Sequence, residues 1–181
     1  MGTRMVPFCK IRHIGVQNVN KAEYSYIIIT EVRQLPNEGV FKEYCAVMHE
    51  TYPDRVVCEE LVREIIARPD YCLFMVLDCS AKVIGTGLLV RTLACDGVVG
   101  VIRDVSVTHE WSDKGVERAL LENMHRYGML VYGVERFESL ACLFGAVEES
   151  TYISLGYTRD SLLTRYTYRA CAHASANGRM A

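Results

Sequence analysis

A short polar loop connects a β-branched run to an amphipathic helical pattern in GVIRDVSVTHEWSDKGVERALL, residues 100–121. The β-branched residues before the loop favour a strand, and the apolar residues after it recur at helical spacing. The backbone N–H groups of Lys114, Gly115 and Val116 would then open a helix beside the end of a strand. Such N–H groups attract a phosphate, and a glycine lets one approach closely. The junction therefore predicts an anion site, although an ordinary strand-turn-helix connection explains the same pattern.

The composition narrows the classes of function that the chain can have. Its 181 residues are enough for one domain with its own core. With 20 basic and 22 acidic side chains and no basic run, the chain is not expected to bind nucleic acid. Its apolar runs are short and interrupted by charges, so neither a membrane partner nor a signal peptide is predicted. The eight cysteines form no Cys-x-x-Cys pair and the five histidines are scattered, so we expect reduced thiols in a cytoplasmic protein and no metal site.

Hydrophobic periodicity predicts elements in the order β-α-α-β-β-β-α-β-α-β. Three consecutive strands joined by short turns make an antiparallel meander. We therefore expect an α/β fold of three layers, in which helices flank a mixed, mostly antiparallel sheet. The domain is expected to span residues 24–169, between an extension at 1–23 and a flexible tail at 170–181. The expected elements cover residues 26–32, 40–48, 57–67, 72–79, 83–93, 98–107, 114–127, 137–144, 148–155 and 157–169.

This order, with a helix starting immediately after the fourth strand, resembles the GNAT superfamily of acyl-CoA-dependent N-acetyltransferases. The resemblance implies that the fourth strand presents backbone groups to the pantetheine arm of acetyl-CoA, and that the loop at 112–117 holds its pyrophosphate. Only Gly115 remains of the family's glycine signature, and Asp113 and Glu117 would repel a pyrophosphate unless they point to solvent. The residues that the resemblance assigns to acetyl-CoA are Val105, Ser106, Val107, Ser112, Asp113, Lys114, Gly115, Val116, Glu117 and Tyr152.

Within that superfamily the chain is most similar to the glucosamine 6-phosphate N-acetyltransferases. Four stretches carry the likeness in the correct order: MHETYPD at 48–54, VIGTGLLV at 83–90, GVIRDVSVTHE at 100–110 and TYISLGYT at 151–158. The resemblance implies a cytoplasmic homodimer whose substrates are acetyl-CoA and a small-molecule amine. It also implies direct acetyl transfer between the two bound substrates, with no covalent intermediate on the enzyme.

Tyr152 and Asp104 are the catalytic candidates that the resemblance implies. Tyr152 would lie near the coenzyme sulfur and hydrogen-bond or protonate the departing thiolate. A phenol has an ordinary pKa of about 10 and a thiol one of about 8.5, so stabilising the thiolate is as plausible as full proton transfer. Packing on the coenzyme arm is the alternative role. Asp104 would accept a hydrogen bond from the sugar or its amine, or would cap the loop.

Further residues are candidates for binding the substrate. Thr51 would lie at the mouth of the sugar site, and Arg103 stands where the related enzymes have a glutamate. In a regular strand Arg103 would face away from Asp104. The sugar phosphate requires a guanidinium or ammonium group, and Arg165 and Arg169 on the last strand are the candidates for it.

The sequence departs from the related enzymes at the end of the fifth strand. Where they carry a carboxylate near the amine, this chain has Ala141 or Leu143, and Glu138 or His109 are possible replacements. A solvated loop histidine is the alternative interpretation of His109. Three functions are therefore open: acetylation of glucosamine 6-phosphate, acetylation of another amine such as a peptide or polyamine, and non-catalytic binding of acyl-CoA.

Overall fold

The computed structural model describes residues 17–19, 22–30, 38–139 and 149–158. Its strands form one sheet in the order β1-β2-β3-β4-β5-β6, in which every neighbouring pair is antiparallel except β5 and β6. The strands are β1 (Gln17–Val19), β2 (Ala22–Ile29), β3 (Tyr71–Asp78), β4 (Val83–Ala94), β5 (Gly97–Val107) and β6 (Arg136–Ser139). The helices are α1 (Glu38–Thr51), α2 (Glu59–Ile66), α3 (His109–Ser112), α4 (Val116–Tyr127), the π-helical turn η2 (Gly128–Tyr132) and α5 (Glu149–Ser154).

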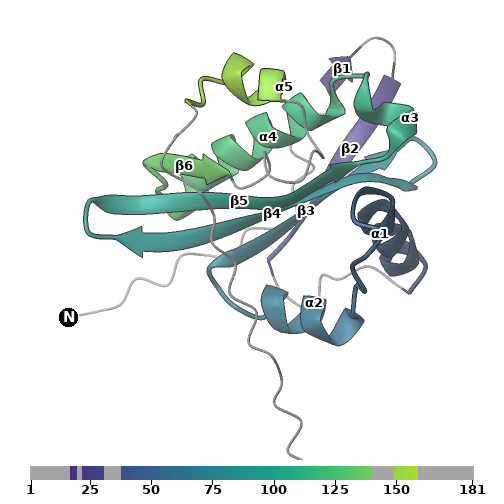
Figure 1. The fold of residues 1–181 in the computed structure, drawn as a ribbon, viewed down its shortest axis with the longest axis horizontal. Coiled ribbons are helices and arrows are strands. Elements are labelled where there is room, and N and C mark those ends of the chain that lie inside the picture. Colours follow the sequence, from purple (N-terminus) through teal and green to yellow (C-terminus); the bar gives the residue numbers. More distant parts are fainter. Residues whose placement is uncertain (1–16, 20–21, 31–37, 140–148, 159–181) are drawn as a thin grey trace, which may run out of the picture.

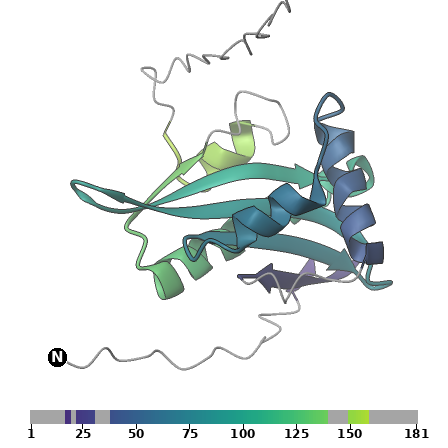
Figure 2. The same ribbon diagram turned by 90° about the horizontal axis from the view of Figure 1, so that it is seen from below.

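Helices cover both faces of the sheet, and this confirms the expected three-layer α/β architecture (Figure 1). Helices α1 and α2 lie on one face, which we call the α1–α2 face, and Figure 2 shows both of them crossing the strands. Helices α4 and α5 lie on the opposite α4 face. Each face has its own core, because Phe41, Val62 and Leu73 pack on the first while Phe74 and Leu120 pack on the second.

The elements differ from the expected ones mainly at their ends. Strand β2 begins at Ala22 and pairs with β1, which lies within the expected extension; the domain boundary near residue 24 stays a prediction. The helix expected at 114–127 begins at Val116, and the short helix α3 precedes it. Beyond Ser139, the strand expected at 137–144 lies outside the described residues, as does all but the first two residues of the strand expected at 157–169.

A β-bulge interrupts the pairing of β4 with β5. Thr86 pairs with Ser106 but Leu88 pairs with Arg103, so two residues of β5 lie opposite Gly87. One of the two is Asp104, whose φ of +50° is in the left-handed region that aspartate tolerates better than most residues. The bulge changes which face each following side chain occupies.

The bulge overturns the expectation that Arg103 faces away from Asp104. Directly paired residues share a face, and Leu88, the partner of Arg103, belongs to the core of the α1–α2 face. Asp104 lines a pocket on that same face together with residues of α1 and α2. Both side chains therefore lie on the α1–α2 face, with Val105 on the α4 face.

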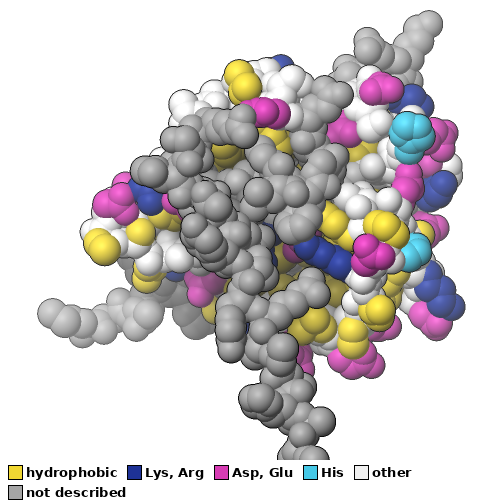
Figure 3. All heavy atoms as spheres, in the orientation of Figure 1, with side chains coloured by type: hydrophobic (Ala, Val, Ile, Leu, Met, Phe, Trp, Pro, Cys, Tyr) yellow, Lys and Arg dark blue, Asp and Glu magenta, His cyan; other side chains and the backbone are white. Residues whose placement is uncertain are grey.

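The described surface carries mixed charge. Figure 3 shows acidic and basic side chains interspersed on the face that it presents, in keeping with the net charge of −2. Among the described residues, no helix combines the length and the apolar character needed to cross a lipid bilayer.

Phe137 fixes β6 between a strand and a helix end. A Cβ atom added at Gly100 would lie 2.8 Å from the Phe137 ring, and one added at Gly128 would lie 2.8 Å from it as well. Two glycines therefore make the space for this ring. Because an aromatic ring cannot bend away as a flexible side chain can, the two positions tolerate no side chain without movement of β6.

We expect Gly128→Ala to lower the free energy of unfolding by about 1–3 kcal/mol, because the new methyl group overlaps the Phe137 ring. Phe137→Leu in the same chain should recover part of this loss, since the smaller side chain relieves the overlap. Urea unfolding measures both effects. Met129→Ala, at an exposed position of the same turn, is the control and should change stability by less than about 0.5 kcal/mol. Equal stability of the Gly128→Ala variant and the wild type would contradict the packing described here.

Candidate active site

The bulge places Asp104 in a group of polar side chains on the α1–α2 face. Arg55, which follows α1, donates a hydrogen bond from Nη1 to Asp104 Oδ1 at 3.0 Å. The Arg55 guanidinium also lies 4.3 Å from the centre of the Tyr52 ring. Burial raises the pKa of the Tyr44 and Tyr52 hydroxyls, and the nearby Asp104 carboxylate raises both further. Both phenols therefore stay neutral and can donate hydrogen bonds near this carboxylate.

Ser106 connects the bulged end of β5 to the end of α1. It is fully buried, and its Oγ donates to the carbonyl oxygen of Val47 at 3.1 Å. It also forms a short hydrogen bond with the Thr51 hydroxyl. The structure thus brings together Thr51, expected at the substrate, and Ser106, expected at the coenzyme. These bonds fix the position of the loop after α1 relative to β5.

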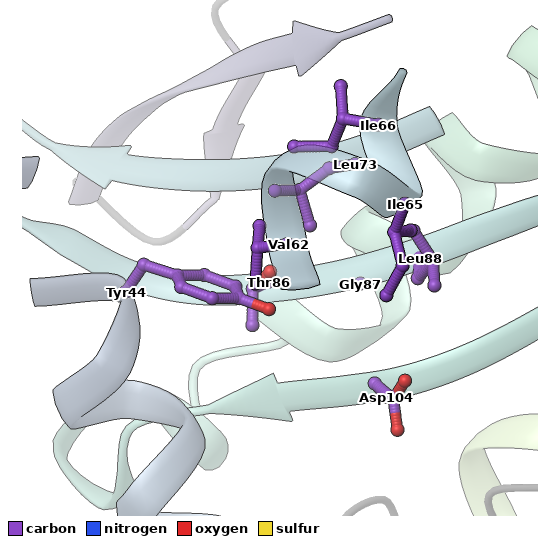
Figure 4. A pocket seen from close by; sticks show the side chains of 9 residues that line it. All are labelled: Tyr44, Val62, Ile65, Ile66, Leu73, Thr86, Gly87, Leu88 and Asp104. Atoms are coloured by element: carbon purple, nitrogen blue, oxygen red, sulfur yellow. The ribbon is translucent and has the colours of Figure 1, made fainter. Parts of the chain in front are cut away.

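A pocket opens beside Asp104 between α2 and the sheet (Figure 4). Its sides come from α1, α2, β3 and β4, and Asp104 of β5 lies at one end. Most of the lining is aliphatic. The lining residues are Tyr44, Val62, Ile65, Ile66, Leu73, Thr86, Gly87, Leu88 and Asp104.

The loop at 112–117 departs in part from the expected anion site. Gly115 immediately precedes α4 with a φ of +75°, a conformation that glycine adopts without strain. The Lys114 N–H is not available to an anion, because it donates to the carbonyl oxygen of Trp111 at 3.1 Å. The Lys114 ammonium lies 4.4 Å from the centre of the Trp111 ring. Helix α4 therefore opens with the N–H groups that follow Gly115, so of the three predicted N–H groups only that of Val116 belongs to its first turn.

The remaining residues of the 112–117 segment differ in burial. Glu117 is buried, with 8% of its surface exposed, whereas Asp113 is exposed. The Ser112 hydroxyl donates to the His109 carbonyl oxygen at 3.1 Å, and Val116 is fully buried. The sequence required both acidic side chains to point to solvent for a pyrophosphate to bind, and only Asp113 does so.

Tyr152 lies in the core of the α4 face with Val105 and Val107 of β5. Its ring meets the Tyr157 ring edge-on, with 5.2 Å between the centres, and the Tyr157 hydroxyl lies 2.6 Å from His125 Nε2. Burial raises the pKa of Tyr157, so its hydroxyl keeps its proton near neutral pH. Tyr152 is buried, whereas Tyr157 and His125 are partly buried, and the three side chains lie on the face of the sheet opposite Asp104.

The other candidates lie away from the bulge or outside the described residues. The backbone N–H of His109 donates to Glu50 Oε1 at 2.6 Å at the start of α3, and the Glu138 carboxylate accepts from Arg136 at the exposed edge strand. Neither contacts Asp104 in the described structure. The proposed phosphate ligands Arg165 and Arg169, and the departures at Ala141 and Leu143, lie outside the described residues. Among the described residues, no cluster of histidine, cysteine and carboxylate side chains is suited to hold a metal ion.

Sequence reasoning missed Arg55, Tyr44 and the bulge. One signal for the bulge was present: apolar residues fall at Ile102 and then at Val105 and Val107, so their alternation shifts by one position. An extra residue between Ile102 and Val105 explains that shift. Arg55 and Tyr44 gave no such signal, because their role depends on contacts with a residue about fifty or more positions away.

We expect acidification to weaken the fold through His125. Burial lowers the pKa of this imidazole from its ordinary 6.5, and the Glu122 carboxylate opposes that shift. Below about pH 6.5 the unfolded chain then binds a proton that the folded chain excludes, so the free energy of unfolding falls as the pH falls. Above pH 6.5 this contribution is complete. Urea unfolding between pH 5.5 and 8 measures the slope.

His125→Gln is the matched variant for this prediction, because an amide can still bond to the Tyr157 hydroxyl but does not titrate. It should lose stability less steeply than the wild type below pH 6.5. Identical slopes for the two proteins would show that another group causes the acid sensitivity.

The described part of the chain has the fold of the GNAT acetyltransferases, as the resemblance in sequence implied. No protein-family model matches the sequence, and no curated protein is similar to it. Several solved structures match it, with TM-scores that include 0.59 and 0.65.

One similar structure is an aminoglycoside acetyltransferase from an uncultured soil metagenomic sample, with a TM-score of 0.65 and 12% identity over 82% of this chain and 97% of that chain. Another is the aminoglycoside 6'-N-acetyltransferase from Acinetobacter baumannii, with a TM-score of 0.63 and 13% identity over 82% and 99%. A third is glucosamine-6-phosphate N-acetyltransferase from Arabidopsis thaliana, with a TM-score of 0.60 and 13% identity over 80% and 99%. These TM-scores establish the fold, whereas identities this low leave the substrate open.

The fold implies acetyl-CoA, and the residues around β5 fit this molecule only in part. Strand β5 pairs with β6 only over Val99–Ile102, so in the described structure residues 103–107 have a strand neighbour on the β4 side alone. Backbone groups on the other side can hold an extended pantetheine arm. Gly115 and the Lys114 ammonium suit the diphosphate, while the buried Glu117 opposes it.

Proposed function

We propose that this protein is an acetyl-CoA-dependent N-acetyltransferase whose acceptor is a small-molecule amine. The bulge in β5 is the observation that supports this most directly. It puts Arg103 and the Asp104 carboxylate together on the α1–α2 face, while Val105 and Val107 stay on the α4 face. An amine bound at Asp104 and an acyl donor held along the backbone of residues 105–107 would meet at the bulge. The two substrates would form a ternary complex without a covalent enzyme intermediate.

Acetyl-CoA supplies the acetyl thioester for this reaction. Asp104 binds the ammonium group of the acceptor and takes one of its protons, which leaves a nucleophilic amine. A backbone N–H of the Val105–Val107 segment donates to the carbonyl oxygen that gains charge during transfer. As the C–N bond forms and the C–S bond breaks, the Tyr152 hydroxyl donates to the departing sulfur. The balanced products are the amide, the free thiol and one proton released to solvent.

Glucosamine 6-phosphate is the acceptor that the resemblance in sequence favours. Its phosphate requires cations, and Arg103 at the bulge, Arg165 and Arg169 are the residues proposed to supply them. Thr51, fixed against Ser106, is proposed to contact the sugar. The proposed protein is cytoplasmic and works as a homodimer, as the resemblance also implies.

Release of free thiol from acetyl-CoA, followed with a set of amines, tests the proposed function. Glucosamine 6-phosphate, an aminoglycoside, simple alkylamines, a polyamine and a lysine peptide should be compared at equal concentrations. We expect turnover with at least one small amine and none without an acceptor. Turnover with the peptide alone would overturn the small-molecule assignment.

Non-catalytic binding of acyl-CoA is the second candidate, and the buried Glu117 is the observation that favours it. A carboxylate in the first turn of α4 weakens the attraction of that helix end for a diphosphate. Saturable binding of acetyl-CoA without turnover of any amine would support this candidate over the enzyme.

We expect Tyr152→Phe to lower kcat by about tenfold to a hundredfold, because the variant keeps the buried ring but loses the proton donor at the sulfur. The KM for acetyl-CoA should change little. Tyr132→Phe is the control, since this phenol bonds weakly to the Tyr71 carbonyl oxygen at 3.4 Å, far along the sheet from the bulge. An unchanged kcat, with chemistry shown to be rate-limiting, would remove Tyr152 from the mechanism.

A further inference from the structure

The pocket beside Asp104 has a chemical character that the proposed function does not use. Its lining is dominated by the side chains of Val62, Ile65, Ile66, Leu73 and Leu88. These come from α2, β3 and β4, and Figure 4 shows them to the right of and above Tyr44, with Asp104 below Gly87 and Leu88. These aliphatic side chains favour a bound hydrocarbon group and offer no hydrogen-bond partner to a hydroxyl group.

The polar groups of the pocket are few, and one of them is already engaged. The Thr86 hydroxyl is buried and donates to the carbonyl oxygen of Phe74 at 2.9 Å. Tyr44 keeps its proton, because burial and the Asp104 carboxylate both raise its pKa. A sugar placed here would bury several hydroxyl groups with one phenol and one carboxylate as partners, at the full cost of desolvating the rest.

The charge in the pocket is negative. Asp104 is the one charged residue of its lining, and its carboxylate is 31% exposed. Arg55, which pairs with it, is 45% exposed and can move toward solvent when an ammonium group replaces it. Arg103 lies on the same face but does not line the pocket. The pocket therefore suits a cation joined to an apolar group and disfavours a phosphate.

The size of the pocket limits the apolar group. Its volume is about 50 Å³, and one water-sized group needs about 10–15 Å³ of such volume. There is room for about three to five such groups beyond the carboxylate. A chain of about four carbons fills this space, and a longer one meets the side chains of α2.

We propose that the acceptor is a primary amine with a short aliphatic group, whose ammonium group binds Asp104 and whose hydrocarbon enters the pocket under α2. This rests on the proposed function and narrows it to a substrate class. The sugar phosphate favoured by the sequence resemblance is then a poorer acceptor. The aliphatic lining and the single carboxylate together define the specificity.

A homologous series of amines from ethylamine to hexylamine tests this with the full-length protein. Binding is measured by calorimetry in the presence of CoA, and kcat/KM is measured separately by thiol release. Affinity should rise about fourfold for each added CH₂, the increment expected for full burial, until butylamine, and then stop rising. Glucosamine 6-phosphate should bind at least tenfold more weakly than butylamine. Asp104→Asn, which suits the left-handed backbone, should weaken butylamine at least tenfold.

Ile65→Ala enlarges the pocket from α2 and should move the best chain length from butylamine to hexylamine. A merely destabilised protein would not show such a shift. Leu61→Ala is the matched control on the same helix, because Leu61 is 52% exposed and does not line the pocket. Its chain-length profile should equal that of the wild type. If Ile65→Ala fails to fold, Ile65→Val removes one methyl group and should move the optimum by one carbon.

The results separate the two proposals. A better kcat/KM with glucosamine 6-phosphate than with butylamine, an optimum that does not move in Ile65→Ala, or no binding of any amine would each overturn the apolar acceptor. The first of these would leave the acetyltransferase intact. Binding with the expected chain-length profile but no acetylation of any amine would support the pocket's ligand class and overturn the proposed enzyme.

Discussion

The extra residue at the bulge in β5 is the constraint on which the rest of the site depends. In a regular strand, residues alternate between faces, so Arg103 and Asp104 would lie on opposite faces. The extra residue at Asp104, whose φ is +50°, shifts the alternation by one position. Arg103 and Asp104 therefore lie on the α1–α2 face, while Val105 and Val107 remain in the α4 core. The bulge thereby gathers two charged side chains on one face of β5, opposite the apolar core on the other face.

The contacts that surround the bulge orient side chains more than they stabilise the fold. The pair of Arg55 and Asp104 is 45% and 31% exposed, so it contributes no more than about 1 kcal/mol. Ser106 is different, because its buried hydroxyl satisfies the Val47 carbonyl oxygen and the Thr51 hydroxyl where α1 ends. The junction of α1 with β5 is therefore the rigid part of the site. The ion pair of Arg55 with Asp104 is the part that another cation can exchange with.

The loop before α4 keeps the backbone conformation expected of an anion site but not the side chains of the expected motif. Gly115 keeps the backbone conformation that lets an anion approach the start of α4. Glu117, buried in the first turn, adds a negative charge where the resembling enzymes have a small residue. Binding of the donor would then depend on the pantetheine arm along β5 and on Tyr152 more than on the diphosphate.

The sequence by itself predicted most of the described helices and strands and their order, because the period of apolar residues is a local property of each strand or helix. It also indicated Tyr152 and Asp104 through short motifs. Between Ile102 and Val105 the alternation of apolar residues shifts by one position, as a bulge requires. Such a single shift identifies a bulge only when the pairing with the neighbouring strand is known. Only the tertiary structure decided which face Arg103 shares, which N–H groups open α4, and what surrounds Asp104. Tyr44, Val62 and Leu88 come from three elements, and their meeting beside one carboxylate depends on how helices pack across a sheet.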